Sequence, residues 1–476
     1  RRGAIGPPRI RRSWGERGMI RIALERVHLP PLGRVTDDTS VLTLRSFAFE
    51  PLCRWRDGEV LPGLFSHWQT GADGCSWRFA IRQGAAFHDG LRCTATHVLA
   101  TIRAALDGRD MFGMPWSYAR YLAGAEIAAE GEDAIRIATP APFADLPEIL
   151  AEFVCARADA AGEATIGTGP YRIARYLPDK DALLVATDPA RGPGAIHAVA
   201  IPDAEARLAA LRDGGAHVAL NLERRDGPAE GHGLLWGQAP NTLSVMAYLN
   251  CAAGLFRDPR ARVAANLAVD RDAIVARLFH GLGLPASSIV SPFHLGMRAG
   301  RPPPLPHDPA RARALFAEAG AGAPVLIRAP AHMPERAPEI AAMIARDLSA
   351  CGCPATVEVV ADRPAYARQV SARRIGDIAL FDSSPHSTFR VLDDKISARS
   401  RGPWWQGSDD PALEAMFRDA AAILDPAARD AAYARCLAHL RDNPPWLYLF
   451  HPIDAYAAVP GAPPLALDHR GVLRFA

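Results

Sequence analysis

Alternation of apolar and polar residues with a period of two marks several strands along the chain. The clearest case runs from Trp77 to Arg82, where one face can be buried while the other meets water. A turn at His88-Asp89-Gly90 follows, and Thr94 is placed to cap a helix that continues through Ile102. Strand, turn and capped helix in so few residues predict a rigid structural corner. No nucleophile or metal-ligand cluster lies in it.

Strand-like and helix-like segments alternate regularly farther along the chain. In order they are strand Val325–Ile327, helix Glu335–Ala350, strand Ala355–Val360, helix Ala365–Arg373 and strand Asp377–Phe381. This βαβαβ order predicts a parallel α/β sheet. Ligands of such sheets bind beyond the carboxyl ends of the strands, so the run from Asp382 to His386 is a candidate binding segment. Upstream, apolar residues at helical spacing predict that Asp258 to Leu278 is helical.

These segments group into two α/β lobes joined by crossing strands. We expect a basic leader over residues 1–18, a first lobe over 19–243 with a subdomain inserted at about 50–163, a second lobe over 244–442, and a return to the first lobe over 443–476. The apolar strand Trp446–Phe450 is expected to make that return. A discontinuous first lobe implies two or more crossovers, which is a hinge geometry with a cleft between the lobes.

Composition and charge narrow the class of protein. The chain has 476 residues, of which 49% are hydrophobic and 22% charged, as is ordinary for a globular protein. Its 54 basic and 52 acidic residues give a net charge of +2, which offers no case for nucleic acid or an anionic membrane as a partner. No apolar run is long enough to predict a transmembrane helix. The first eighteen residues lack the apolar core of a complete signal peptide.

Signatures of enzymes and cofactor sites are absent from the sequence. It contains no Gly-x-Ser-x-Gly, no His-Glu-x-x-His and no phosphate loop, so no catalytic residue and no cofactor is predicted. The eight cysteines are too sparse for a disulfide scaffold, although a pair between distant cysteines stays open. Cys351-Gly-Cys353 has no second pair or neighbouring His, so a metal site is not expected there.

Residues suited to binding a ligand gather after the predicted sheet. His386 lies at the predicted cleft edge, and Thr388-Phe389-Arg390 adds an aromatic ring and a guanidinium suited to a ligand carboxylate. One indole of Trp404-Trp405 is a candidate for a cleft wall, since aromatic walls often hold ligands. Asp393-Asp394 is a candidate for binding a cation or an amine, but a solvated pair on a helix is the favoured interpretation.

Four ordered motifs resemble the family 5 extracytoplasmic solute-binding proteins of ABC transporters, the dipeptide, oligopeptide and nickel-binding group. The first motif comprises Pro62-Gly63-Leu64, Trp68, Asp73-Gly74, Arg82-x-Gly84, Phe87-His88-Asp89-Gly90 and Thr94-Ala95. The others are Gly167-Thr168-Gly169-Pro170-Tyr171, then Tyr248-Leu249-Asn250 with Phe256 and the segment from Arg260 to Asp270, and finally Asp308-Pro309-Ala310 through Gly320. The similarity covers roughly Met19 to Tyr456. It breaks at Phe381 to Pro385, where the family usually has a Gly-Trp, acidic, Pro-rich run.

This resemblance implies an α/β, two-lobed periplasmic-binding-protein fold of type II, from the large cluster with an extra subdomain in lobe 1. It implies a monomer in the periplasm that is not an enzyme. That monomer would capture a small solute, most simply a short peptide or an amino-acid-derived compound, and deliver it to the permease subunits of an ABC importer. It needs no cofactor, nucleic acid or membrane insertion. By analogy the pocket draws on Thr39, Ser40, Trp116, Tyr118, Tyr248, Asn250, Asp382, Ser383, Ser384, His386, Phe389, Arg390, Trp404 and Trp405.

Alternative functions stay open at this point. Within the family, a nickel or other metal chelate is a second ligand class, with His386 as a possible ligand, and an opine-like molecule is a third. An intracellular sensor built on this fold would carry an N-terminal DNA-binding domain, and only about eighteen residues precede the first predicted strand. A hydrolase with a cleft is disfavoured by the missing nucleophile–base motif.

Overall fold

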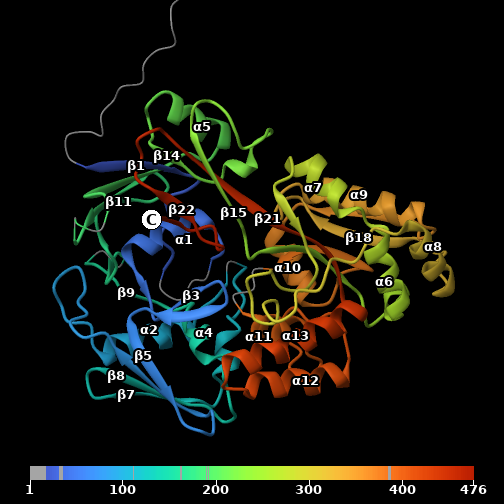
Figure 1. Cartoon of the computed structure of the whole chain (residues 1–476), viewed down its shortest axis with the longest axis horizontal. Helices are drawn as coiled ribbons and strands as arrows, with labels where there is room; N and C mark the ends of the chain where they lie inside the picture. Colours follow the sequence, from blue (N-terminus) through green and yellow to red (C-terminus); the bar gives the residue numbers. More distant parts are fainter. Residues whose placement is uncertain are drawn as a thin grey trace, which may run out of the picture.

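The computed structural model describes residues 18–31, 36–110, 112–160, 163–188, 190, 192–383 and 387–475. Two lobes lie side by side, the first blue to green and the second yellow to orange (Figure 1). Twelve strands of the described chain hydrogen-bond into one sheet that passes through both lobes, with β11-β12-β13-β1-β14-β21-β16-β20-β18-β19 as its main order and β15 and β17 paired to β21.

The first lobe is built on the blue strand β1 (Met19–Leu24). It pairs in parallel with β13 (Ala195–Ala200) and with β14 (Val218–Ala219). The antiparallel strands β12 (Asp181–Ala186) and β11 (Tyr171–Leu177) extend this part of the sheet. The helices here are α1 (Thr39–Ala48) and α5 (Ala204–Arg212), with η2 (Leu222–Arg224) after β14 and the hairpin of β22 (Leu465–Leu467) and β23 (Leu473–Phe475) near the end of the chain.

An antiparallel subdomain within the first lobe surrounds a separate apolar core. Its sheet has the order β5 (Phe65–Thr70), β6 (Ser76–Ile81), β8 (Ala134–Ala138), β7 (Glu126–Glu130). The other elements are β2 (Glu50–Pro51), the hairpin β3 (Cys53–Arg56) and β4 (Glu59–Pro62), β9 (Val154–Arg157), β10 (Ile166–Gly167), and the helices α2 (Ala95–Leu106), α3 (Tyr118–Tyr121) and α4 (Leu146–Leu150).

The strand–turn–helix corner predicted from Trp77 onward is confirmed. Strand β6 leads through the turn to Thr94, the N-cap of α2, and Thr94 forms a capping box with His97. The ring of Phe87 is buried and packs edge-on against the His97 ring, with centroids 5.2 Å apart. The corner is therefore a packed scaffold element.

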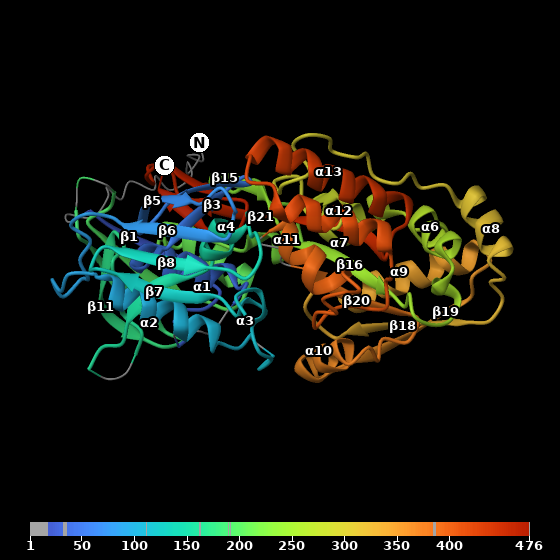
Figure 2. The same ribbon diagram turned by 90° about the horizontal axis from the view of Figure 1, so that it is seen from below.

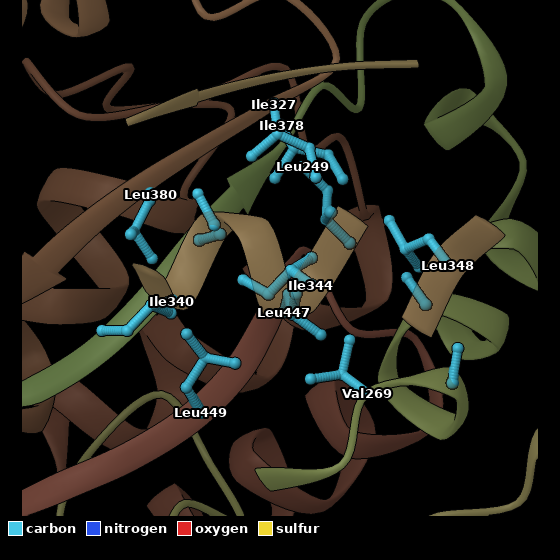
Figure 3. Close-up of a cluster of buried hydrophobic side chains, with 14 of the residues drawn as sticks. Leu249, Val269, Ile327, Ile340, Ile344, Leu348, Ile378, Leu380, Leu447 and Leu449 are labelled. Carbon is cyan, nitrogen blue, oxygen red and sulfur yellow. The ribbon is translucent and has the colours of Figure 1, made fainter. Parts of the chain in front are cut away.

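The second lobe contains the predicted βαβαβ unit. Strands β18 (Val325–Pro330), β19 (Ala355–Val360) and β20 (Ile378–Ser383) are parallel, and α9 (Ala337–Ala350) and α10 (Arg363–Ser371) connect them. Ile340, Ile344 and Leu348 of α9 point into the main apolar core, against leucines of β20 and β21 (Figure 3). The helical spacing in α9 thus reported its buried face correctly.

The prediction that Asp258 to Leu278 is helical throughout is wrong at one point. The chain forms α6 (Pro259–Ala268) and α7 (Arg271–Phe279), separated by Val269 and Asp270. The side chain of Asp270 accepts a hydrogen bond from the Ala273 backbone N–H and so starts the second helix. The rest of the lobe comprises η3 (Leu255–Arg257), β17 (Gly283–Pro285), α8 (Pro309–Glu318), α11 (Thr388–Val391), the π-helix η4 (Leu392–Ile396), α12 (Pro411–Ala422) and α13 (Pro426–Asp442).

Two long stretches of strand join the lobes. Strand β21 (Trp446–Ala458) pairs with β16 (Ser244–Leu249) in the second lobe through its first half, and with β15 (Leu235–Pro240) in the first lobe through its second half. Figure 2 shows β21 between the two lobes. Residues near Asn241 and Pro452 are therefore the hinge.

Among the helices that the structure describes, none has the length and apolar character of a membrane-spanning segment.

Candidate functional site

A cavity of about 150 Å³ lies between the lobes, beside the two hinge strands. We call it the hinge cavity. The first lobe contributes residues that follow β1 and β14, the second lobe contributes α7 and the loop after β18, and the hinge strands lie between them. Its lining residues are Asp37, Thr39, Leu42, Glu223, Arg224, Arg225, Asn241, Thr242, Leu243, Val245, Leu278, Phe279, Leu282, Pro334, Glu335, Arg336, Phe450, Pro452, Ile453, Asp454 and Arg470.

The position of this cavity follows from the parallel strands. The segments around Thr39 and Glu335 follow the carboxyl ends of β1 and β18, where α/β sheets bind ligands. Asp38 fixes the first segment, because its side chain accepts a hydrogen bond from the Val41 N–H and caps α1. The Thr39 hydroxyl also accepts a hydrogen bond from the Asn221 side-chain amide, at 2.7 Å.

The walls of the hinge cavity are apolar on the second-lobe side and charged at the meeting of the lobes. Leu278, Phe279 and Phe450 supply apolar surface. Arg224 of the first lobe lies 3.7 Å from a Glu335 oxygen of the second. A second ion pair across the cleft has the charges reversed: Arg336 of the second lobe pairs with Asp226 of the first. A ligand in this cavity would therefore meet apolar surface together with charges of both signs.

Two buried carboxyl groups stand on the first-lobe side of the hinge. Burial, with the neighbouring Glu223 carboxyl, raises the pKa of Asp454 to about 8. An Asp454 oxygen accepts a hydrogen bond from the Asn241 side chain at 2.5 Å. Burial also raises the pKa of Glu223, whose carboxyl accepts a hydrogen bond from the Ala455 N–H. Burial therefore favours the protonated form of Asp454.

A second group of polar contacts, away from the hinge, joins the subdomain to the second lobe. Arg120 of α3 forms ion pairs with both Asp393 and Asp394 of the π-helix η4. Asp394 is fully buried, and Arg390 approaches it at 3.6 Å. The interpretation of Asp393-Asp394 as a solvated pair is therefore wrong, because the facing lobe buries both carboxylates and supplies their cation.

Lys395 of the same π-helix turns back toward its own lobe. Its ammonium donates a hydrogen bond to the Ser383 hydroxyl at 2.6 Å, and burial with the nearby Arg390 lowers the pKa of Lys395 to about 8. Beside it, the Arg363 guanidinium lies 3.3 Å from Asp382, whose pKa is raised by burial. The carboxyl end of β20 is thus filled by charged groups that pair with each other.

Aromatic rings fill the rest of the contact between the lobes. Phe389 of the second lobe packs against Tyr121 and Phe143 of the first, with ring centroids 5.3 and 4.8 Å apart. Trp404 packs on Phe381 and on Phe112 of the subdomain, with centroids 5.1 and 6.3 Å apart. The two lobes are therefore in contact in this conformation, and the cleft is closed on the subdomain side.

The predicted site residues fall into three groups. Thr39 lines the hinge cavity. Phe389, Arg390 and Trp404 lie in the contact between the lobes, together with Tyr118, whose ring lies under the Arg390 guanidinium at 5.4 Å. Asp382 and Ser383 lie beside this contact, paired with Arg363 and Lys395 of their own lobe. The remaining predicted residues lie elsewhere in the fold or outside the described residues.

The third group does not join either assembly. The Ser40 hydroxyl is buried and donates to Asn221; Trp116 lines a different cavity, within the first lobe; and Tyr248 is buried beneath Phe381 and Trp446. Asn250 follows β16 at the end of the sheet opposite Ser383, and Trp405 stands in a loop under Arg373 and Arg401. Ser384 and His386 lie outside the described residues.

Sequence reasoning missed most of the hinge cavity. Arg224, Glu335 and Arg336 come from loops that approach each other only after both lobes have folded, and no motif marks them. Phe279 and Leu282 follow the helix predicted over Asp258 to Leu278, and no sequence feature indicates a cavity beside them. Asp37 also lines the cavity, and no sequence motif marks it. The only available signal was the charged pair Glu335-Arg336, which follows β18 after a short loop.

The geometry defines a two-lobed protein with a closed cleft, and comparison with known proteins assigns its class. The model of the bacterial extracellular solute-binding proteins, family 5 Middle, matches residues 59–388. The chain therefore belongs to the family 5 extracellular solute-binding proteins. The resemblance and the two-lobed fold predicted from the four motifs are confirmed.

Similar proteins share most of their length with this chain. A probable di/tripeptide-binding protein 5 of Pseudomonas aeruginosa is 25% identical over 441 residues, which cover 83% of this chain and 82% of that protein. Among solved structures, NikA of Brucella suis in complex with Fe(III)-EDTA aligns with a TM-score of 0.77 at 19% identity, covering 96% of this chain and 100% of that one. The periplasmic binding protein DppA of Helicobacter pylori, in complex with the peptide STSA, aligns with a TM-score of 0.71 at 19% identity, covering 93% and 94%.

Proposed function

We propose that this solute-binding protein captures a short peptide or an amino-acid-derived compound in the hinge cavity and delivers it to the permease of an ABC importer. The observation that carries the proposal is the wall of that cavity. It joins apolar side chains to charges of both signs, and it is formed by both lobes. A zwitterion with an apolar side chain is complementary to such a wall, since it offers a cation, an anion and a hydrophobic group.

The size of the cavity favours a small peptide. Sites for drug-sized ligands span roughly 300–1,000 Å³, whereas the hinge cavity holds about 150 Å³. A di- or tripeptide, or a single conjugated amino acid, suits this space better than a long peptide. The name of the di/tripeptide-binding relative supports the same ligand class.

The proposal extends to cellular setting and mechanism. The protein acts outside the cytoplasm, as a monomer that carries out no covalent chemistry. Closure is stabilised because the ligand contacts both lobes at once, which favours the closed state over the open one. The permease would then recognise the closed form.

The test measures ligand binding with a pair of variants at one position in the cavity wall. Leu278→Trp fills the hinge cavity, whereas Leu278→Ala enlarges it at the same position. Native mass spectrometry of the purified protein identifies any retained solute, and after removal of that solute by unfolding and refolding, calorimetry measures binding of di- and tripeptides. We expect peptides to bind the wild type and Leu278→Ala but not Leu278→Trp. Binding of a nickel chelate in place of peptides would overturn the proposed ligand class.

A further inference from the structure

A second cavity, of about 230 Å³, lies wholly within the first lobe and its subdomain. We call it the lobe-1 cavity. Helix α1, strands β2 and β3, helix α2, the segment 151–154 and the C-terminal segment 468–474 surround it. Four of its lining residues are arginines, three are acidic and several are aromatic: Arg45, Arg54, Arg470, Arg474, Glu50, Glu152, Asp468, Phe49, Trp55, Trp116 and Phe153.

The charges of this cavity do not balance. Glu50 pairs with Arg54 and also with Arg82, Glu152 pairs with Arg470 at 2.9 Å, and Asp468 pairs with Arg474 at 2.6 Å. Each carboxylate is therefore engaged by at least one arginine.

Arg45 is the fourth arginine of this wall. Its guanidinium interacts electrostatically with the Glu152 carboxylate, which Arg470 already pairs, so four arginines of this wall share three carboxylates. Burial lowers the pKa of Arg45 to about 10, so the group stays charged at neutral pH. An excess of positive charge in a partly buried wall is costly unless a further anion joins it. Two buried donors in the same wall, Trp116 Nε1 and Arg470 Nε, lack a hydrogen-bond acceptor among the described residues.

The lobe-1 cavity adjoins the hinge cavity. Both cavities include Leu42 and Arg470 in their walls, and the consecutive residues Thr36 and Asp37 line one each. The two cavities therefore share part of one wall.

We propose that the lobe-1 cavity is a subsite for a carboxylate held by Arg45, with the aromatic wall packing against the carbon chain that carries it. The inference rests on the proposed function and makes it narrower. Such a subsite would favour acidic peptides or acidic amino-acid conjugates. These ligands carry a second carboxylate, in addition to the main-chain carboxylate, and this second group would reach the subsite. A separate small carboxylate ion would fit the same subsite. The experiment distinguishes this ion from a carboxylate that belongs to the bound peptide.

The experiment compares the dipeptides Ala-Glu and Ala-Gln, which differ in one carboxylate. We expect the wild type to prefer Ala-Glu by about tenfold or more, which is the value of a charge-assisted hydrogen bond. Arg45→Gln should lose that preference, and Arg45→Lys should retain part of it. Arg103→Gln, at an exposed position of α2, is the control and should leave it unchanged. Removing one of four arginines that share three carboxylates should leave the melting temperature of the ligand-free Arg45→Gln protein equal or higher, so lost binding would not reflect unfolding.

Succinate distinguishes the source of the carboxylate. Competition between succinate and Ala-Glu through Arg45 means that the solute itself reaches the subsite. Additive stabilisation by both ligands, lost in Arg45→Gln, means that a separate carboxylate occupies it. Equal binding of the two dipeptides, with no effect of succinate, would overturn the subsite while the proposed function stands. Failure of every dipeptide to bind would instead count against the proposed function.

A separate observation concerns two cysteines of the subdomain. The sulfurs of Cys93, just before α2, and Cys155, on β9, lie 3.8 Å apart and both residues are buried. The Thr101 hydroxyl donates to the Cys155 sulfur at 3.7 Å, and the hydrogen bonds from Cys93 and Thr101 lower the pKa of Cys155. A disulfide needs a sulfur–sulfur distance of about 2 Å, so a small side-chain movement would bring the two atoms to bonding distance.

We infer that Cys93 and Cys155 form a disulfide when the protein folds in an oxidising compartment. The Cys155 thiolate attacks a sulfur of a donor protein disulfide and forms a mixed disulfide. The Cys93 thiolate then attacks the Cys155 sulfur and releases the reduced donor. Two electrons pass to the donor and two protons are lost to solvent.

Peptide mapping without reduction tests this inference. After export, protease digestion should yield one linked peptide containing Cys93 and Cys155, and dithiothreitol should split it and lower the melting temperature. Cys93→Ser should abolish the linked peptide, whereas Cys436→Ser, at a buried cysteine far along the chain, should not. Complete alkylation of both thiols in the unreduced, denatured protein would overturn the inference.

Discussion

His451 is a buried side chain near the hinge that makes the stability of the protein depend on pH. The ring lies on β21, is 1% exposed, and its Nδ1 is 3.1 Å from the Leu243 carbonyl oxygen, to which it donates. Burial lowers the pKa of His451 to about 4. Because the native pKa is depressed below the ordinary value of about 6.5, the unfolded chain takes up the proton first as the pH falls. The stability from neutral His451 is complete above pH 6.5 and is lost as the pH falls through 4.

We therefore predict that His451→Gln flattens the acid side of the stability profile. The wild type should lose on the order of 3 kcal/mol from this group between pH 7 and pH 4. The variant should be less stable at pH 7 but lose less on acidification. Urea unfolding at both pH values measures this, with His67→Gln at an exposed position of β5 as the control. Parallel profiles for wild type and His451→Gln would contradict the prediction.

Asp454 predicts a dependence of the opposite sign. Its native pKa is about 8, raised from an ordinary value near 4, so its contribution to stability is complete below pH 4 and is lost as the pH rises through 8. Asp454→Asn should remove that loss, because an amide oxygen can still accept the hydrogen bond from Asn241. The free energy of unfolding of the variant relative to wild type should rise from pH 6 to pH 8.5. A constant difference across that range would show that Asp454 does not carry the dependence.

At the scale of elements, the sequence pattern predicted those features that depend on residues close together in the chain. The capped corner before α2 and the βαβαβ unit were read correctly, because capping residues and the buried face of α9 are set by neighbours in sequence. The break between α6 and α7 was not predicted. The only local sign of it is the capping residue Asp270, which lies within a continuous helical pattern of apolar residues. Asp393 and Asp394 were misread for a different reason: their partner Arg120 lies 273 and 274 residues away in the other lobe.

Helix α9 offers a direct test of the second-lobe core. Ile344→Ala removes a fully buried side chain from that core and should cost about 2–5 kcal/mol of unfolding free energy, through lost burial and the cavity left behind. Arg346→Ala, two residues along on the exposed face, should change stability by about 0.5 kcal/mol or less. Denaturant unfolding of both variants checks this. Similar losses at the two positions would mean that α9 does not pack as described.

At the scale of the whole molecule, closure depends on contacts made only when the lobes meet. Arg120 is the sharpest case, because its removal leaves the buried Asp394 with Arg390 alone in the closed state, whereas opening exposes that carboxylate to water. Removing one partner of a buried pair costs about 3–5 kcal/mol. In a two-state protein this cost falls on the closed conformation and shifts the population toward the open one.

We predict that Arg120→Ala increases the radius of gyration of the ligand-free protein in solution scattering, and that saturating ligand restores much of the compaction. The reason is that ligand contacts in the hinge cavity, made by both lobes, compensate for the missing ion pair. Arg78→Ala removes an exposed pair with Glu130 within the subdomain and should leave the scattering curve unchanged, since such pairs contribute about 0–1 kcal/mol. If Arg120→Ala stays as compact as the wild type, the aromatic contacts of Phe389 and Trp404 hold the lobes together without it. Closure would then be set by packing rather than by charge.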